Sequence, residues 1–140
     1  MCSTVGDQLA LTRSALEPLL DEYGVDVYIA GHVHSYSVSW PLKGGAVTAK
    51  SLVDPAGVVH VLEGNGGVPN HGARDPAWVN TIRNCSGDPT QSLYRVCGTG
   101  GAYGRLLASN ASVLEYEHVE NPTGRVSDTW AITKTTGASA

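Results

Sequence analysis

A short apolar run that ends in two histidines constrains the fold of this chain more than any other stretch. The run VDVYIA, residues 25–30, is rich in β-branched side chains and is followed by Gly31, a pattern typical of a buried strand. His32 and His34 come next, separated by one residue. Because α/β folds place their ligands at the carboxyl ends of strands, the two imidazoles lie where a binding site is expected.

A helix is predicted immediately before this strand. Apolar side chains recur on one helical face at Leu9, Leu16, Leu20 and Tyr23. Gly24 follows as a stop signal, and Pro18 within the pattern predicts that the helix begins late or kinks there. We expect this helix to pack beside the strand.

The second half of the sequence is β-rich. Strands are predicted within residues 44–53, 57–64, 103–110, 112–121 and 125–134, with a hairpin connection at residues 121–124. Between them, residues 64–101 form a long stretch rich in Gly, Pro, Asn and Ser, which predicts a functional loop or a surface excursion.

Composition narrows the class of protein. The chain has 140 residues, of which 41% are hydrophobic and 16% charged, as expected for one globular domain. Its net charge of −4, without a basic stripe, argues against nucleic acid as a partner. No apolar run is long enough to span a membrane, and the N-terminus lacks the features of a signal peptide.

Cysteines and sequons indicate the secretory pathway. Cys85 and Cys97 flank a short loop and could form a disulfide in an oxidising compartment, which would leave Cys2 without a partner. Asn84 and Asn110 each begin an Asn-x-Ser triplet, the acceptor for N-glycosylation. The signal peptide of such a protein would not be in this chain.

The two histidines allow two interpretations. Residues two apart in an extended chain face the same way, so both rings could enter one pocket and bind the two ions of a pair. We expect Gly31 to let the backbone turn sharply and approach another group closely. Alternatively, His32 and His34 are loop residues hydrogen-bonded to nearby backbone.

Three segments carry a resemblance to a known family. DVYIAGHVHSY, VVHVLEGNGGVP and GTGGAYGRLLASNASVLEYEHVENPTGRVSDTW resemble the C-terminal portion of purple acid phosphatases, which are dinuclear metallophosphoesterases. The similarity runs from the predicted helix to about residue 134. It implies an α/β fold, namely the C-terminal half of an α/β/β/α sandwich, with one N-terminal helix and then mostly strands.

The resemblance also implies a site and a reaction. By position in the motif, His32 would bind a divalent ion, Zn(II), Fe(II) or Mn(II), and His34 would bind Fe(III). The substrate would be a phosphate monoester, attacked by a water that the two ions activate. The full-length protein would be secreted, vacuolar or lysosomal. Residues 1–134 would be part of the metallophosphoesterase domain, and residues 135–140 a disordered tail.

The chain departs from the family in its ligand set. The other motifs that supply ligands, including a Gly-Asp-x-x-Tyr and a Gly-Asn-His-Glu, are absent from this sequence, so the chain alone is expected to be inactive. No catalytic residue can be assigned within it. After Tyr36, Ser37 and Val38 replace the charged pair that many relatives have.

The remaining candidates have ordinary interpretations beside the functional ones. Tyr36 and His71 could line the rim of a pocket, although a packed aromatic is the favoured interpretation for Tyr36 and an ordinary loop residue for His71. His60 is expected to be a sheet residue, and His118 to lie on an exposed strand.

The alternative function is a non-catalytic, β-rich binding module whose histidines are vestigial or hold a single metal ion. In either case we expect an exposed sheet edge through which the chain associates.

Overall fold

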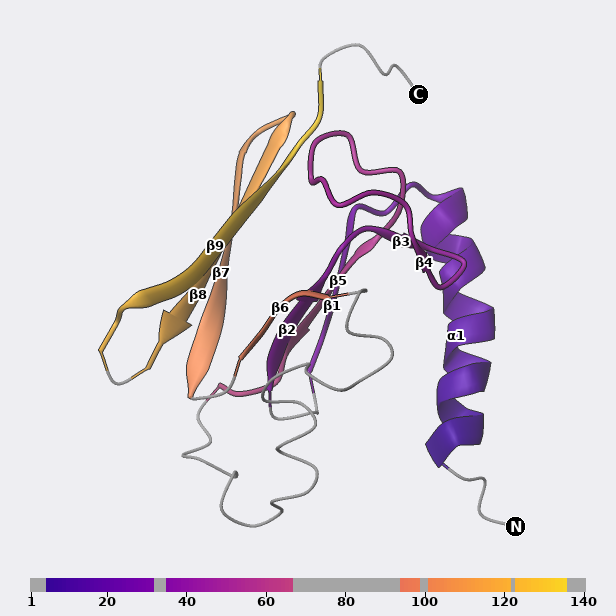
Figure 1. Cartoon of the computed structure of the whole chain (residues 1–140), viewed down its shortest axis with the longest axis horizontal. Helices are drawn as coiled ribbons and strands as arrows, with labels where there is room; N and C mark the ends of the chain where they lie inside the picture. Colours follow the sequence, from indigo (N-terminus) through magenta and orange to yellow (C-terminus); the bar gives the residue numbers. More distant parts are fainter. Residues whose placement is uncertain (1–4, 32–34, 67–93, 99–100, 122, 136–140) are drawn as a thin grey trace.

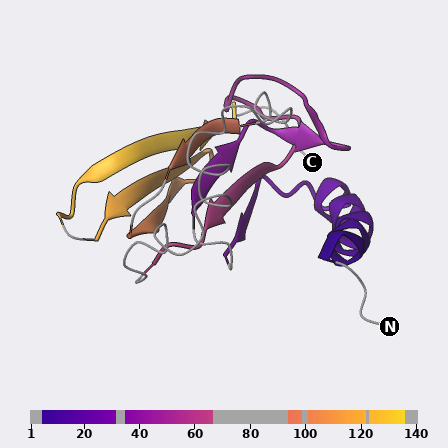
Figure 2. The ribbon, with the colours of Figure 1, turned by 60° about the horizontal axis from the view of Figure 1, so that its bottom comes forward.

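The computed structural model describes residues 5–31, 35–66, 94–98, 101–121 and 123–135, with residues 5–12, 94 and 96–98 described as backbone. The elements are α1 (Val5–Glu22), β1 (Val27–Ala30), β2 (Tyr36–Ser39), β3 (Leu42–Lys43), β4 (Ala46–Val47), β5 (Val59–Glu63), β6 (Tyr94–Gly98), β7 (Ala102–Asn110), β8 (Val113–Glu120) and β9 (Val126–Thr133). They form three layers: α1, a four-stranded sheet, and a three-stranded sheet (Figure 1). The view in Figure 2 keeps α1 and the three-stranded sheet on opposite sides. The expected fold class, one helix followed by mostly strands, is confirmed.

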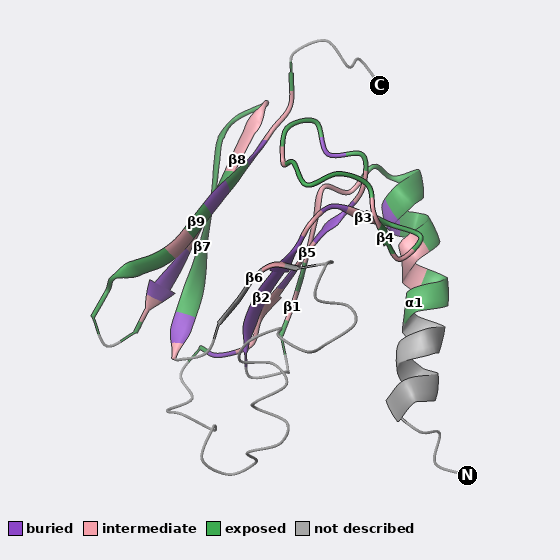
Figure 3. Ribbon diagram, viewed as in Figure 1, coloured by how far each residue is buried: buried purple, intermediate pink, exposed green. Residues whose placement is uncertain are grey.

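Helix α1 lies against the four-stranded sheet and ends in a glycine cap. Gly24 has a φ of 59°, and the amides of Gly24 and Val25 donate to the carbonyls of Asp21 and Leu20. This pattern is a Schellman motif, which favours glycine because the backbone is left-handed there. The helix runs through Pro18 as one element, so the expected late start is wrong. Only Leu20 of its described side chains is buried (Figure 3).

The four-stranded sheet has the order β1-β5-β2-β6. β1 runs parallel to β5, and β2 is antiparallel to both β5 and β6. The sequence patterns did not indicate β2, since YSVS alternates small polar residues, or β6, which lies inside the long Gly- and Pro-rich stretch. All four residues of β2 are nevertheless buried, because the strand is central in the sheet, between β5 and β6, and Tyr36 and Val38 pack against the three-stranded sheet.

The three-stranded sheet is an antiparallel meander, β7-β8-β9; its three strands were predicted from the sequence, and the predicted hairpin connection lies between β8 and β9. The core lies between the two sheets. The four-stranded sheet contributes Tyr36, Val38, Val59 and Val61, and the three-stranded sheet contributes Tyr116, Trp130 and Ile132. Burial of these side chains is the main favourable term that holds the two sheets together.

The segment between β2 and β5 contains a small hairpin rather than the long strand predicted for residues 44–53. β3 and β4 pair through a turn at Gly44 and Gly45, whose φ angles are 56° and 78°. The predicted strand therefore shrinks to Ala46–Val47, because the left-handed turn reverses the chain just before it. Among the described residues, no helix is both long and apolar enough to cross a membrane.

Candidate functional site

The motif with the two histidines follows β1, at the end of the four-stranded sheet where the carboxyl ends of two parallel strands lie. β1 and β5 run parallel, with Ala30 in register with Leu62, so their carboxyl ends lie side by side. The described chain ends at Gly31 after β1 and resumes at Ser35, whose carbonyl accepts a hydrogen bond from the Gly64 amide at 3.1 Å. His32 and His34 themselves lie outside the described residues, so their predicted metal ligation stays a prediction.

Gly31 does not have the special backbone role that we expected. Its φ is not among the left-handed values, and a Cβ built on it would meet only the Glu63 carbonyl oxygen, at 3.7 Å. That distance is ordinary van der Waals contact. The turn into the histidine motif therefore does not require glycine at this position.

A buried polar network begins at Glu63, the last residue of β5. Glu63 Oε2 lies 2.8 Å from His118 Nδ1 and also accepts a hydrogen bond from the Tyr116 hydroxyl. The side chains of His118 and Glu63 are only 7% and 11% exposed. His118 was expected on an exposed strand, and that expectation is wrong. Its ring lies on the inner face of β8, beside Tyr116, where the opposite sheet covers it.

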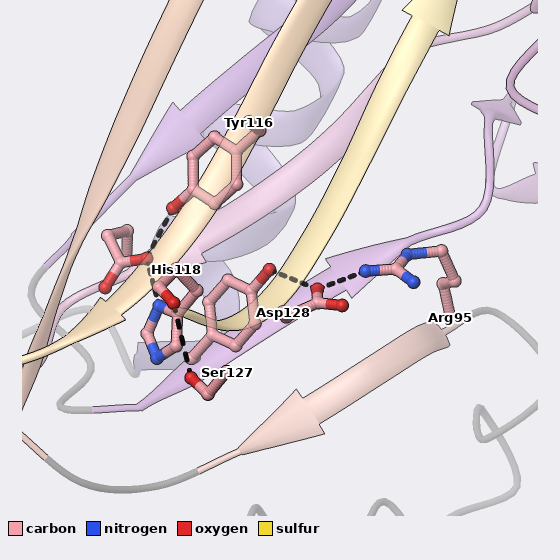
Figure 4. Close-up of polar contacts among 7 residues, drawn as sticks. Arg95, Tyr116, His118, Ser127 and Asp128 are labelled. Atoms are coloured by element: carbon pink, nitrogen blue, oxygen red, sulfur yellow. Dashed lines mark hydrogen bonds and ion pairs between the residues drawn. The ribbon is translucent and has the colours of Figure 1, made fainter. Parts of the chain in front are cut away.

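The network continues through Tyr36, the first residue of β2, to Asp128 and Arg95, which are labelled in Figure 4. The Tyr36 ring stacks on the His118 ring with centroids 3.7 Å apart. Its hydroxyl donates to Asp128 Oδ2 at 2.7 Å, and Arg95 on β6 forms an ion pair with the same carboxylate. Tyr36 is 1% exposed, so it is the packed aromatic of the two interpretations and does not lie at a pocket rim.

Burial sets the protonation of the two phenols. Desolvation, followed by the hydrogen bond to Asp128, raises the pKa of Tyr36 far above its usual value. Desolvation and the bond to Glu63 raise the pKa of Tyr116 in the same way. Both hydroxyls therefore remain protonated donors. The network ties the strands of one sheet to those of the other, and it includes Tyr36, two residues after His34 in sequence.

The described residues do not gather a metal centre by themselves. Within residues 5–31, 35–66, 94–98, 101–121 and 123–135, no three His, Cys, Asp or Glu side chains come together as a metal site. The carboxylates of Glu63 and Asp128 are engaged by neighbouring side chains. Two imidazoles suit a zinc or iron ion, but a pair of ions also needs carboxylate oxygens. A dinuclear centre at the carboxyl ends of β1 and β5 would therefore need ligands from outside the described residues.

Two buried oxygens at the end of β5 and the start of β2 have no hydrogen-bond partner among the described residues. They are Ser35 Oγ and Glu63 Oε1. Ser35 directly follows the histidine motif, and Glu63 ends the strand beside it. Buried polar atoms are normally paired, so the end of β5 and the start of β2 retain hydrogen-bonding capacity.

The other predicted site residues are placed as follows. His71, Asn84 and Cys85 lie outside the described residues, and Cys97 lies in β6 with its side chain outside them. The disulfide therefore stays a prediction. Asn110 ends β7, is exposed, and accepts a 2.8 Å hydrogen bond from the Ser112 amide. His60 is a half-buried sheet residue, as expected, and its ring meets that of Tyr28 edge to face.

Comparison with known proteins adds two findings. The chain is 27% identical over 128 residues to an Arabidopsis thaliana protein named "Probable inactive purple acid phosphatase 1"; the match covers 87% of this chain and 18% of that protein. It also superimposes on the structure of purple acid phosphatase PPD1 from yellow lupin (Lupinus luteus) seeds. That match has a TM-score of 0.61 and 19% identity, and it covers 86% of this chain and 20% of the lupin chain.

The resemblance to purple acid phosphatases is confirmed. The curated relative carries the likeness in sequence, and the lupin structure carries it in fold. No protein-family model matches the sequence. The chain spans about a fifth of the length of these two proteins, so what it shares with purple acid phosphatases is one segment of their fold.

Proposed function

We propose that this chain contributes His32 and His34 to a dinuclear metal centre that hydrolyses phosphate monoesters, with the other ligands coming from residues outside this chain. The observation that carries the proposal is the position of the His-x-His motif. It follows β1 at the edge where two parallel strands end, in a segment with the fold of a purple acid phosphatase. A bound pair of ions supplies Lewis-acid chemistry for phosphate ester hydrolysis.

The chain's own residues would hold this motif in place. Tyr36 is buried two residues after His34, and its hydroxyl is bonded to Asp128, which Arg95 also binds. These contacts fix where the backbone enters β2. Ala30, in the ladder with β5, fixes where it leaves β1. The two histidines would therefore be supported from both sides, which limits the motion that would otherwise separate metal ligands.

Metal uptake by the purified chain tests the proposal. The chain would be equilibrated with zinc and iron salts and dialysed, and its metal content measured together with turnover of para-nitrophenyl phosphate at acid pH. We expect zinc uptake that falls in His32→Ala and His34→Ala, without turnover. The control is His60→Gln, because His60 faces α1 rather than the motif. Uptake that ignores both alanine substitutions would overturn the proposal, and turnover by this chain alone would contradict the need for outside ligands.

A non-catalytic module that holds one metal ion or a partner is the second candidate. It is favoured by the word "inactive" in the name of the Arabidopsis relative. Inorganic phosphate distinguishes the two candidates. A remnant of a phosphatase centre would bind phosphate only after zinc loading, and His32→Ala would abolish this binding. A module unrelated to phosphate chemistry would show no zinc-dependent phosphate binding in a calorimetric titration.

A further inference from the structure

We propose that β7 is a self-pairing edge through which two copies of this chain join their three-stranded sheets into one six-stranded antiparallel sheet. β7 lies at one end of its sheet and pairs with β8 alone. Eight of its nine residues are exposed, and only Ala102 is buried (Figure 3). A long, exposed edge strand offers unpaired backbone groups to another strand.

The other sheet edges of the described structure are less suited to such pairing. β1 has four residues and β6 has five. β9 has eight residues, but Val53 forms a bridge with Thr133 near its end, and the Asp54 amide donates to the Thr133 carbonyl. β7 is therefore the longest of these edges and carries a single charged residue, Arg105.

The side chains of β7 carry apolar surface on both faces of the strand. Tyr103 and Leu107 are on the outer face and are 43% and 60% exposed, whereas Leu106 is on the inner face and is 48% exposed. Proline, which would block pairing, does not occur in β7. Of the devices that commonly protect an edge strand, β7 has one charged residue, Arg105, and a register shift between Ala108 and Asn110, which leaves Ala102–Ala108 regular.

The sequence of β7 selects one register. A two-fold axis through Leu106 places Leu106 opposite Leu106 and pairs the regular part of the strand as far as Gly104 and Ala108; the register shift of β7 lies beyond Ala108. Arg105 then faces Leu107 of the second copy, so the two arginines do not oppose each other. Gly104 faces Ala108, which leaves room for close approach. A shift of the axis to Arg105 would place like charges directly opposite, which is unfavourable. An isologous dimer of this kind closes on itself.

Two lysine substitutions on the same face of β7 test the pairing. Leu107 lies in register with Glu115 on β8, so Leu107→Lys gains an opposite charge within its own sheet while placing a lysine opposite Arg105 of the second copy. Ser109→Lys adds the same charge beside the same Glu115, but it lies at the register shift of β7, beyond the residues that pair around Leu106. The first substitution should break the dimer, and the second should leave it intact.

Sedimentation equilibrium of the 140-residue chain over a range of concentrations provides the readout. We expect a monomer–dimer equilibrium whose Kd rises about tenfold or more in Leu107→Lys and changes little in Ser109→Lys. Leu106→Lys, which places two lysines on the two-fold axis, should weaken the dimer as well. Circular dichroism would confirm that each variant folds. A wild-type chain that is monomeric at every concentration overturns the proposal. So does a dimer that survives Leu107→Lys and Leu106→Lys, and equal dissociation by both matched lysines overturns the register.

Discussion

Two neighbouring side chains on the same sheet face differ strongly in burial. Leu106 on β7 and Tyr116 on β8 are in register and share the inner face, yet Leu106 is 48% exposed and Tyr116 is 2% exposed. Tyr116 lies beneath the four-stranded sheet and bonds to Glu63 of β5. β7 extends beyond that cover. Position in a strand pattern therefore gives the direction of a side chain, whereas burial depends on what the opposite layer covers.

Truncation of each of these two residues should expose the difference most clearly. Tyr116→Ala removes a buried ring that stacks on Trp130 and leaves a cavity, so we expect a loss of about 3–5 kcal/mol in the free energy of unfolding. Leu106→Ala should cost less than about 1 kcal/mol in the monomer, because the side chain is half exposed. Urea unfolding of both variants measures the difference, and similar losses would contradict the distinction between covered and uncovered positions.

A glycine beneath the covered ring sharpens the comparison. A Cβ on Gly104 would lie 2.2 Å from the Tyr116 hydroxyl oxygen, and the ring is held in place by its bond to Glu63. Gly104→Ala should therefore destabilise the fold by about 1–3 kcal/mol through overpacking. Gly31→Ala is the control, because its Cβ would have an ordinary 3.7 Å contact. Thermal unfolding in which the two alanines behave alike would contradict the close packing of Gly104 against Tyr116.

Two glutamates allow a buried polar contact to be compared with an exposed one. Glu63 is 11% exposed and accepts from both Tyr116 and His118, whereas Glu117 is 40% exposed and pairs with Arg105. Glu63→Gln should cost about 1–3 kcal/mol, because it perturbs buried hydrogen bonds. Glu117→Gln should cost less than about 1 kcal/mol. Chemical denaturation distinguishes them, and a larger loss for Glu117→Gln would reverse our assignment of the stabilising network.

The smallest expected effect depends on pH. Burial lowers the pKa of His60; the Glu17 carboxylate has a smaller effect that raises it, and the Arg13 guanidinium has a still smaller effect that lowers it. Below about pH 6.5 the unfolded chain takes up the proton that the folded chain resists, so this contribution to stability decreases as pH falls. Its slope cannot exceed about 1.4 kcal/mol per pH unit. His60→Gln should flatten the stability profile between about pH 5 and 7; an unchanged slope would show that other groups dominate.

The sequence predicted the parts of the fold that have strong local patterns. The helix before residue 25, the strand before Gly31 and the β7-β8-β9 meander each carry a clear periodicity. β2 lacks one, because its burial comes from its central place in the sheet, between β5 and β6, rather than from an apolar pattern of its own. β6 was not predicted, because it lies in a stretch whose Gly and Pro content predicts a loop.

The buried network could have been found partly from the sequence. In LEYEHVE, Glu115 and Glu117 alternate with Leu114, Tyr116 and His118, so the histidine shares the face of two large side chains. That alternation indicates an inward His118. Its partner Glu63 comes from a strand 55 residues away in sequence, and only the packing of the two sheets brings them together. The histidines of the motif were indicated by spacing and by resemblance.

Hydrogen exchange of the backbone amides, measured on the 140-residue chain below the concentration at which it dimerises, tests the central claim most directly. That claim is that the sandwich is covered around β2, β5 and β8 and open along β1 and β7. We predict the slowest exchange in β2, β5 and β8, which pair on both sides, and fast exchange in the half of the β1 and β7 amides that face outward. Equally slow exchange of all amides in β1 and β7 in the monomer would contradict the claim, because those edges would then be covered.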